Sequence, residues 1–409
     1  MKKLVLFSAL LAATSLFAED GWLSRPAGIK IGQRMTLRPY VSFSYTYDSN
    51  ADSRRDSHGE DASYWTANPG MNLDYQGDNW KLDGRVYYNR HEYSSGRTSQ
   101  HNHDSYGEQL GFHWTNIENG GAGWAVILSE RYTKTLQDDD FSESSGRGLW
   151  RDRQQFDATV QLQRRFNENW HSSLNAGYYW LDYDNDSNTY APLYGWDRWN
   201  VGTQIGFTAS KWTDIFLAGT YQGYRQDNIE SADGDRDSKG YTVHIGLGSY
   251  MTDRISYSVS AGYSRFEYSS HGSADGFTYE GDIRWKIGET WTTSLLFASY
   301  YHPSERTYGS AQRCDSVSWG LAKSLVRGKL NATLDISYRH NETEYSSTKS
   351  GDWDLNLITA RLGLNYTLNR LLTVFARGEY QNELNEGSAI SSHYDYERWR
   401  LTVGLKFTY

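Results

Sequence analysis

The sequence predicts an all-β protein, a transmembrane antiparallel up-and-down β-barrel of about 18 strands with short periplasmic turns and long extracellular loops. Three observations predict this class. Polar and apolar residues alternate over stretches of about ten residues from Met35 onward. Aromatic residues make up 15% of the chain. Short and long connections alternate between the stretches.

The amino terminus, MKKLVLFSALLAATSLFA, has the layout of a secretory signal peptide: two lysines, an apolar run and then small residues. We expect residues 1–18 to be removed by cleavage after Ala18, with cleavage after Ser15 as the alternative. Residues 19–34 then form a periplasmic lead or a partial plug, and residues 35–409 form the outer-membrane barrel.

Composition excludes several classes of protein. The mean hydropathy is −0.76 and no later apolar stretch reaches helix-spanning length, which rules out a helical membrane protein. A barrel escapes this test because only alternate residues of a strand face lipid. The net charge of −9 is spread along the chain without a basic stripe, so nucleic acid is not an expected partner. A single cysteine, Cys314, cannot form an internal disulfide.

The last segment shows the strand pattern most clearly. Trp399, Leu401, Val403, Leu405, Phe407 and Tyr409 alternate with Arg398, Arg400, Thr402, Gly404, Lys406 and Thr408. One face therefore meets lipid and the other meets water. A soluble β-sandwich shows the same alternation of polar and apolar residues. The connections between strands therefore decide whether the apolar face meets lipid.

Short and long connections alternate along the chain. The short ones lie at 77–79, 118–123, 167–169, 211–212, 252–253, 288–289, 327–328 and 369–370. The long ones lie near 49–61, 95–103, 138–150, 185–194, 227–237, 269–275, 303–312, 344–351 and 384–393. Eight turns and nine loops join eighteen strands, with both termini at the periplasmic rim. Closure also leaves no unpaired strand edge in hydrocarbon.

Aromatic residues recur at matching depth along the strands. Tryptophans at or just after short turns predict an inner interfacial girdle: Trp80, Trp124, Trp170, Trp212 and Trp291. Tyrosines near the opposite strand ends predict an outer girdle: Tyr45, Tyr88, Tyr132, Tyr178, Tyr221, Tyr263, Tyr301, Tyr338 and Tyr380.

The opening strands resemble a known family. Tyr47-Asp48-Ser49-Asn50 ends an early strand, and the Pro69-Gly70 pair comes where the next strand pair is expected to open. In both respects the chain is similar to the putative β-barrel porin-2 family. That resemblance implies an outer-membrane barrel and, for some members, a place beside exopolysaccharide synthesis or secretion machinery. Leu405, Phe407 and Tyr409 resemble the carboxyl-terminal signal that the barrel assembly machinery reads.

Charged residues are expected on the inward face of the strands. The basic set comprises Arg38, Arg339, Arg361, Arg377, Arg398, Arg400 and Lys406, and the acidic set comprises Asp335, Glu379, Glu280 and Asp282. Closure makes the last strands neighbours of the first, so the arginines among them can form a basic wall. Two interpretations stay open: a lumen that favours anionic or sugar-like solutes, or a network of salt bridges in which Asp335 and Glu379 neutralise that wall.

Metal binding and catalysis lack complete residue sets. His101 and His103 flank Asn102 beside Asp104 without a third ligand. Asp233, Asp235 and Asp237 lack the glycine and distal glutamate of a calcium loop. His171 and Ser173 are close in sequence, with no catalytic signature around them. We therefore expect no metal, no cofactor and no enzymatic activity.

The expected function is passive diffusion of small hydrophilic solutes through the outer membrane of a Gram-negative bacterium. One alternative is a conduit for exopolysaccharide export, and another is a non-conducting barrel whose loops bind a ligand or a surface. A lipid-facing hydrolase is a further alternative, which activity on phospholipid or peptide would favour. Expected partners are outer-membrane lipid and lipopolysaccharide, the barrel assembly machinery, and an oligosaccharide or polysaccharide.

Overall fold

The structure is a computed structural model. It describes residues 28–50, 61–94, 102–117, 121–136, 152–183, 195–210, 213–226, 236–249, 254–268, 272–303, 311–326, 328–345, 353–387 and 395–409. The expected signal peptide, the first part of the lead, Trp212 and most of the long connections lie outside these residues. Among the described residues, no helix is long and apolar enough to cross a membrane.

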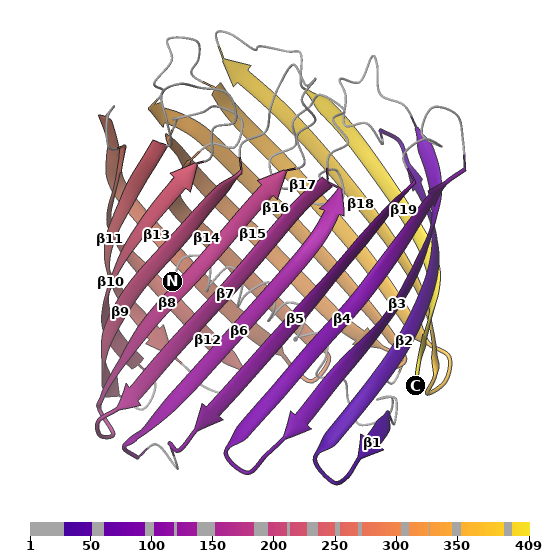
Figure 1. Cartoon of the computed structure of the whole chain (residues 1–409), viewed down its shortest axis with the longest axis horizontal. Coiled ribbons are helices and arrows are strands. Elements are labelled where there is room, and N and C mark those ends of the chain that lie inside the picture. Colours follow the sequence, from indigo (N-terminus) through magenta and orange to yellow (C-terminus); the bar gives the residue numbers. More distant parts are fainter. Residues whose placement is uncertain are drawn as a thin grey trace.

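Nineteen strands form a single antiparallel sheet in the described part of the chain. They are β1 (Ile29–Ile31), β2 (Met35–Asp48), β3 (Ala62–Gln76), β4 (Trp80–Tyr93), β5 (His103–Thr115), β6 (Gly123–Leu136), β7 (Asp152–Arg165), β8 (Trp170–Tyr183), β9 (Trp196–Ser210), β10 (Thr213–Gln226), β11 (Arg236–Ser249), β12 (Ile255–Tyr268), β13 (Gly272–Ile287), β14 (Trp291–Pro303), β15 (Ala311–Leu325), β16 (Leu330–Tyr345), β17 (Trp353–Thr367), β18 (Leu372–Gly387) and β19 (Tyr396–Thr408). Strands β2 to β19 pair in chain order and tilt across the wall of the barrel (Figure 1).

The barrel closes where β19 pairs with β2, from Arg400 opposite Asp48 to Thr408 opposite Tyr40. This closure confirms the eighteen-stranded antiparallel barrel. Short strand β1 is additional, and it pairs with the first residues of β2, Met35 to Leu37. It therefore continues the edge of β2 where β19 has ended, and it lies at the rim of short turns (Figure 1).

Connection lengths depart from strict alternation at one place. The connection between β12 and β13 spans only residues 269–271, so the prediction of a long loop over 269–275 is wrong. The stretch Ser273-Ala274-Asp275-Gly276 has turn-forming residues but extends β13 instead, because backbone pairing with β12 continues as far as Gly272 opposite Tyr268. The rim at which the longer connections join strands is called the long-loop rim below.

The outward face is apolar, as the alternation predicts. Leu401 and Val403 on β19 are 56% and 57% exposed, whereas Arg398 on the opposite face is 5% exposed. Outward aromatic rings pair across neighbouring strands toward the long-loop rim, for example Tyr380 with Trp399 at 4.4 Å between ring centroids. Such rings are suited to an interfacial girdle.

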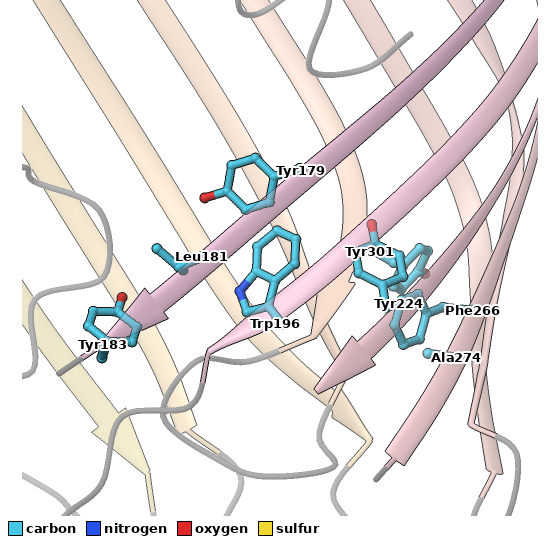
Figure 2. Packing of buried hydrophobic residues seen from close by; sticks show 8 residues of the cluster. All are labelled: Tyr179, Leu181, Tyr183, Trp196, Tyr224, Phe266, Ala274 and Tyr301. Carbon is cyan, nitrogen blue, oxygen red and sulfur yellow. The ribbon is translucent and has the colours of Figure 1, made fainter. Parts of the chain in front are cut away.

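Inward aromatic residues pack together near the long-loop rim between β8 and β14. This upper cluster consists of Tyr179, Leu181, Tyr183, Trp196, Tyr224, Phe266, Ala274 and Tyr301. Figure 2 shows the ring of Tyr179 beside Trp196, and Tyr224, Phe266 and Tyr301 gathered next to them. The Tyr179 and Trp196 ring centroids are 4.5 Å apart, and those of Tyr224 and Phe266 are 5.4 Å apart. The inside of the barrel therefore has an apolar core on this side.

The end of β14 leaves its neighbour and enters this cluster. Pairing between β13 and β14 stops at Glu280 opposite Ala298, although both strands continue toward the rim. Beyond that point Tyr301 is 4% exposed and packs with Phe266 and Ala274. The prediction that Tyr301 belongs to the outer girdle is therefore wrong. Its hydroxyl lies 2.8 Å from where a Cβ on Gly276 would stand, so the bare backbone of β13 admits the ring.

The Pro69-Gly70 pair lies within β3, so it does not open a strand pair. Tyr40 stands opposite Gly70 across β2 and β3. A Cβ on Gly70 would lie 2.4 Å from the Cζ atom of Tyr40, so the tyrosine ring lies across the strand in the space that glycine leaves.

Candidate functional site

Strand pairing brings the predicted basic residues onto one side of the barrel interior. The inward faces of β16 to β19, β2 and β4 carry Arg339, Arg361, Arg377, Arg398, Arg400, Lys406, Arg38 and Arg85, a set called the basic wall below. Closure of β19 onto β2 makes this wall continuous, because residues that are far apart in sequence become register partners.

One buried ion pair holds the closure at the long-loop rim. The Arg398 guanidinium donates to both Asp48 carboxylate oxygens, at 2.6 Å from Nη2 to Oδ2 and 2.9 Å from Nε to Oδ1. The two side chains are only 6% and 1% exposed. Ser49 and Asn50 add bonds across the same seam, since the Trp399 amide donates to Ser49 Oγ at 2.7 Å and Asn50 Nδ2 donates to the Glu397 carbonyl at 3.3 Å. The Asp48-Ser49-Asn50 motif therefore joins the first barrel strand to the last.

Other arginines of the wall share carboxylates. Glu379 accepts from Arg361 at 2.8 Å and lies 3.7 Å from Arg400, while Arg38 pairs with Asp74. Asp335 stands opposite Arg361 in the β16–β17 register. Glu379 thus pairs with arginines of the wall, whereas Asp335 makes no ion pair among the described residues. Sequence reasoning missed Asp48 and Asp74.

Three cations of the wall make no ion pair in the described part of the chain. Arg85 donates to the Tyr40 hydroxyl, Lys406 lies 4.5 Å from the centroid of the Tyr40 ring, and Arg377 lies 5.1 Å from the Phe375 ring. Alternation alone places Arg85 on the inward face. Its approach to Lys406 depends on Tyr40 crossing β3, a contact with no signal in the sequence.

The opposite side of the interior, from β7 to β13, has a different character. A cavity of about 500 Å³ is lined there by polar side chains that include Gln161, Gln163, His171, Ser173, Asp282 and Arg284. Asp282 and Arg284 pair at 2.6 Å. His171 and Ser173 both face the cavity, whose lining also includes the charged side chains of Arg164, Arg165 and Asp214.

Glu280 belongs to a buried network above this cavity. His244 bonds Ser260 Oγ at 3.1 Å and Thr278 Oγ1 at 2.9 Å, and Ser260 donates to Glu280 at 3.1 Å. In a catalytic triad the carboxylate orients the imidazole, but here Glu280 lies 3.9 Å from His244 and accepts from the serine. His244 is 3% exposed, so the network satisfies polar groups of the wall.

Candidate metal ligands do not converge among the described residues, where no group of three His, Cys, Asp or Glu side chains is placed to hold an ion. His101, Asp233 and Asp235 lie outside those residues. His103 is inward and stacks on His91 at 4.4 Å between ring centroids. Asp104 is bonded to Arg90 at 3.0 Å.

The carboxyl-terminal residues face outward. Leu405, Phe407 and Tyr409 are 41%, 43% and 59% exposed, and they form one apolar row on β19 and its last residue. Lys406 lies between them on the inward face, opposite Ser42 of β2.

A closed eighteen-stranded antiparallel barrel, apolar outside and charged inside, defines the class of porin-like transmembrane barrels. The chain belongs to one family within it, described as "Putative beta-barrel porin 2", whose model matches residues 24–409. This match confirms the resemblance carried by the opening strands. No curated protein matches the chain.

Solved structures similar to this chain include the siderophore receptor PirA of Pseudomonas aeruginosa, with 7% identity, a TM-score of 0.45, and coverage of 93% of this chain and 81% of that one. The FrpB iron transporter of Neisseria meningitidis (F3-3 variant) has 10% identity, a TM-score of 0.45, and coverage of 95% and 86%. The outer membrane protein opdK of Pseudomonas aeruginosa has 13% identity, a TM-score of 0.43, and coverage of 91% and 99%.

Proposed function

We propose that this chain forms a water-filled channel in the outer membrane of a Gram-negative bacterium, for passive diffusion of small hydrophilic solutes. The observation that carries the proposal is the division of the barrel interior into two sides. The basic wall lies along β16 to β19, β2 and β4, and a cavity lined by amides, hydroxyls and charges of both signs lies along β7 to β13.

Barrels of this strand number are wide enough for an aqueous lumen. Solutes that cross such a lumen exchange hydration for contacts with the wall, so charged rings and hydrogen-bond donors set selectivity. Excess cations on the basic wall favour anionic solutes, and the polar cavity favours sugars. The proposal assigns no catalytic step, cofactor or metal to the chain.

Insertion into the membrane is part of the same proposal. The outward row of Leu405, Phe407 and Tyr409 is the segment that the barrel assembly machinery reads, and the apolar outer face contacts lipid and lipopolysaccharide.

Single-channel conductance of the refolded protein in a planar bilayer tests the channel. Steady conductance is expected, with a reversal potential in a salt gradient that shows anion preference, and with partial block by oligosaccharide. A correctly folded barrel that stays silent contradicts diffusion and favours loop-based binding or gated export of polysaccharide.

A further inference from the structure

The three unpaired cations of the basic wall share an aromatic floor. Tyr40 reaches over Gly70, so its hydroxyl meets β4, where Arg85 donates from Nε at 3.3 Å and from Nη2 at 3.2 Å. Lys406 approaches the same ring from β19, with Nζ 4.5 Å from the centroid. One tyrosine thus fixes cations from strands on both of its sides.

A second glycine extends this floor. Phe375 on β18 lies across β19 at Gly404, where an added Cβ would stand 2.4 Å from the phenylalanine Cζ. The Arg377 guanidinium lies 5.1 Å from the Phe375 ring centroid. Tyr40 and Phe375 are themselves buried, at 6% and 9% exposure. Their rings therefore support the cations from beneath instead of facing the solute.

Carboxylates near the floor are already engaged. Glu379, which acts on Arg377, is bonded to Arg361 at 2.8 Å. Asp74 is bonded to Arg38, and Asp83 lies 3.8 Å from Lys81. No carboxylate lies within 4.0 Å of Arg85, Arg377 or Lys406 in the described part of the chain.

The three charges also act on one another. Lys406 lies in the field of both Arg85 and Arg377, and Arg377 lies in the field of Arg85. Cation–π contacts stabilise each cation without cancelling its charge. Repulsion among like charges beside a protein wall is only partly screened, so a bound anion would relieve it.

We propose that Arg85, Arg377 and Lys406 form a binding site for an oxyanion, the carboxylate or phosphate group of a small hydrophilic solute. Arg85 and Arg377 are exposed to the lumen, so their guanidinium forks can donate to two oxygens. Lys406 adds a point charge between them. The site deepens the proposed channel function by naming the solute class, and it rests on that function only for the route by which the anion arrives.

Inorganic phosphate is the first probe. Its ³¹P line width is measured with refolded protein in detergent micelles, where binding is observed without conduction. Arg85→Gln, Arg377→Gln and Lys406→Gln are each expected to weaken phosphate binding about tenfold, the loss of one charge-assisted contact. Lys406→Arg keeps a cation on the Tyr40 ring and is expected to retain binding. Circular dichroism checks that each variant keeps its β-sheet.

Lys81→Gln is the matched control. Lys81 lies on the same strand as Arg85 and on the same face, but it lies beside Asp83 and off the aromatic floor. It is expected to bind phosphate as the parent protein does. Succinate is expected to displace phosphate, which shows that carboxylates share the site, whereas glucose is expected to have no effect.

Absent binding to the parent protein, or equal binding by all four glutamine variants, overturns the site. If succinate does not displace bound phosphate, the site does not bind oxyanions as a class, and that assignment is overturned. A barrel that conducts ions but does not bind phosphate supports the proposed channel and contradicts the oxyanion site. A barrel that binds phosphate but does not conduct supports the site and contradicts the channel. Failure of this inference is therefore distinct from failure of the proposed function.

Discussion

Single residues fix the closure of the barrel and the position of its charges. Asp48 is a short side chain at the end of the first barrel strand, yet it accepts from Arg398 and lies 4.0 Å from Arg400. Burial makes this contact important, because loss of the partner of a buried cation lowers the folding stability far more than loss of the partner of an exposed one.

Asp48→Asn tests the closure. Asp48→Asn removes the buried carboxylate charge to which Arg398 donates, so we expect the free energy of unfolding to fall by about 3–5 kcal/mol. The measurement is the urea midpoint of the barrel refolded in lipid vesicles. The control is Asp78→Asn, because Asp78 pairs with Arg34 at 2.8 Å while 81% exposed. Its loss is expected to stay below about 1 kcal/mol. Equal losses would contradict the role of the seam.

Gly70→Ala tests the aromatic floor. The new methyl group would meet Tyr40 at 2.4 Å, so the ring must shift and Arg85 must lose its hydroxyl acceptor. We expect a stability loss of about 1–3 kcal/mol, as for other overpacked sites, together with weaker phosphate binding. Gly84→Ala is the control, since its nearest neighbour would stand at 3.6 Å, an ordinary contact. Unchanged phosphate binding by Gly70→Ala would remove Tyr40 from the site.

At the scale of the strands, the barrel sheet is regular except at β14. β14 begins paired with β13 and ends inside the barrel, where Tyr301 completes the upper cluster. The strand stays paired with β15 as far as Pro303 opposite Ala311, so it loses backbone pairing only on the edge that faces β13. Packing of an aromatic ring replaces backbone pairing over the last residues of the strand.

Tyr301→Ala tests whether this packing holds the end of β14. Loss of a buried aromatic side chain is expected to cost about 3–5 kcal/mol. Tyr241→Ala is the comparison, because Tyr241 is outward and 44% exposed. Its expected cost is on the order of 1 kcal/mol, the value of an aromatic pair. Both are measured as shifts of the urea midpoint, and equal shifts would mean that the upper cluster adds nothing to stability.

At the scale of the whole molecule, the net charge of −9 gives no hint of an anion preference. Selectivity depends on where charges stand, and the inward cations of β4, β18 and β19 are concentrated on one wall. A solute inside the lumen meets these local charges, so the net charge of the chain does not decide its selectivity.

Ionic strength tests this arrangement. Screening shortens the reach of the wall charges from about 10 Å at 0.1 M salt to about 3 Å at 1 M. The anion-to-cation permeability ratio, measured from reversal potentials at a fixed gradient ratio, is expected to fall toward unity as salt rises. The Arg377→Gln/Lys406→Gln double variant is expected to show the low ratio already at 0.1 M. A permeability ratio that changes neither with salt nor in the double variant would contradict selectivity by the basic wall.

Much of the fold was predictable because it depends on local periodicity. Alternation along Arg398 to Tyr409 assigns every side chain to lipid or lumen, and the structure keeps that assignment. The number of strands follows from counting connections. Prediction was wrong at residues 269–275 and at Tyr301, because backbone pairing with β12 and packing against Phe266 outweighed local residue preferences.

The sequence by itself determined the barrel, its orientation of side chains and the set of inward charges. Only the tertiary structure decided which of these charges are neutralised. Asp48 meets Arg398 across 350 residues of chain, and Lys406 meets Arg85 through Tyr40 on a third strand. Alternation carries information along one strand, whereas pairing depends on the register between strands and on the glycines that let a ring cross its neighbour.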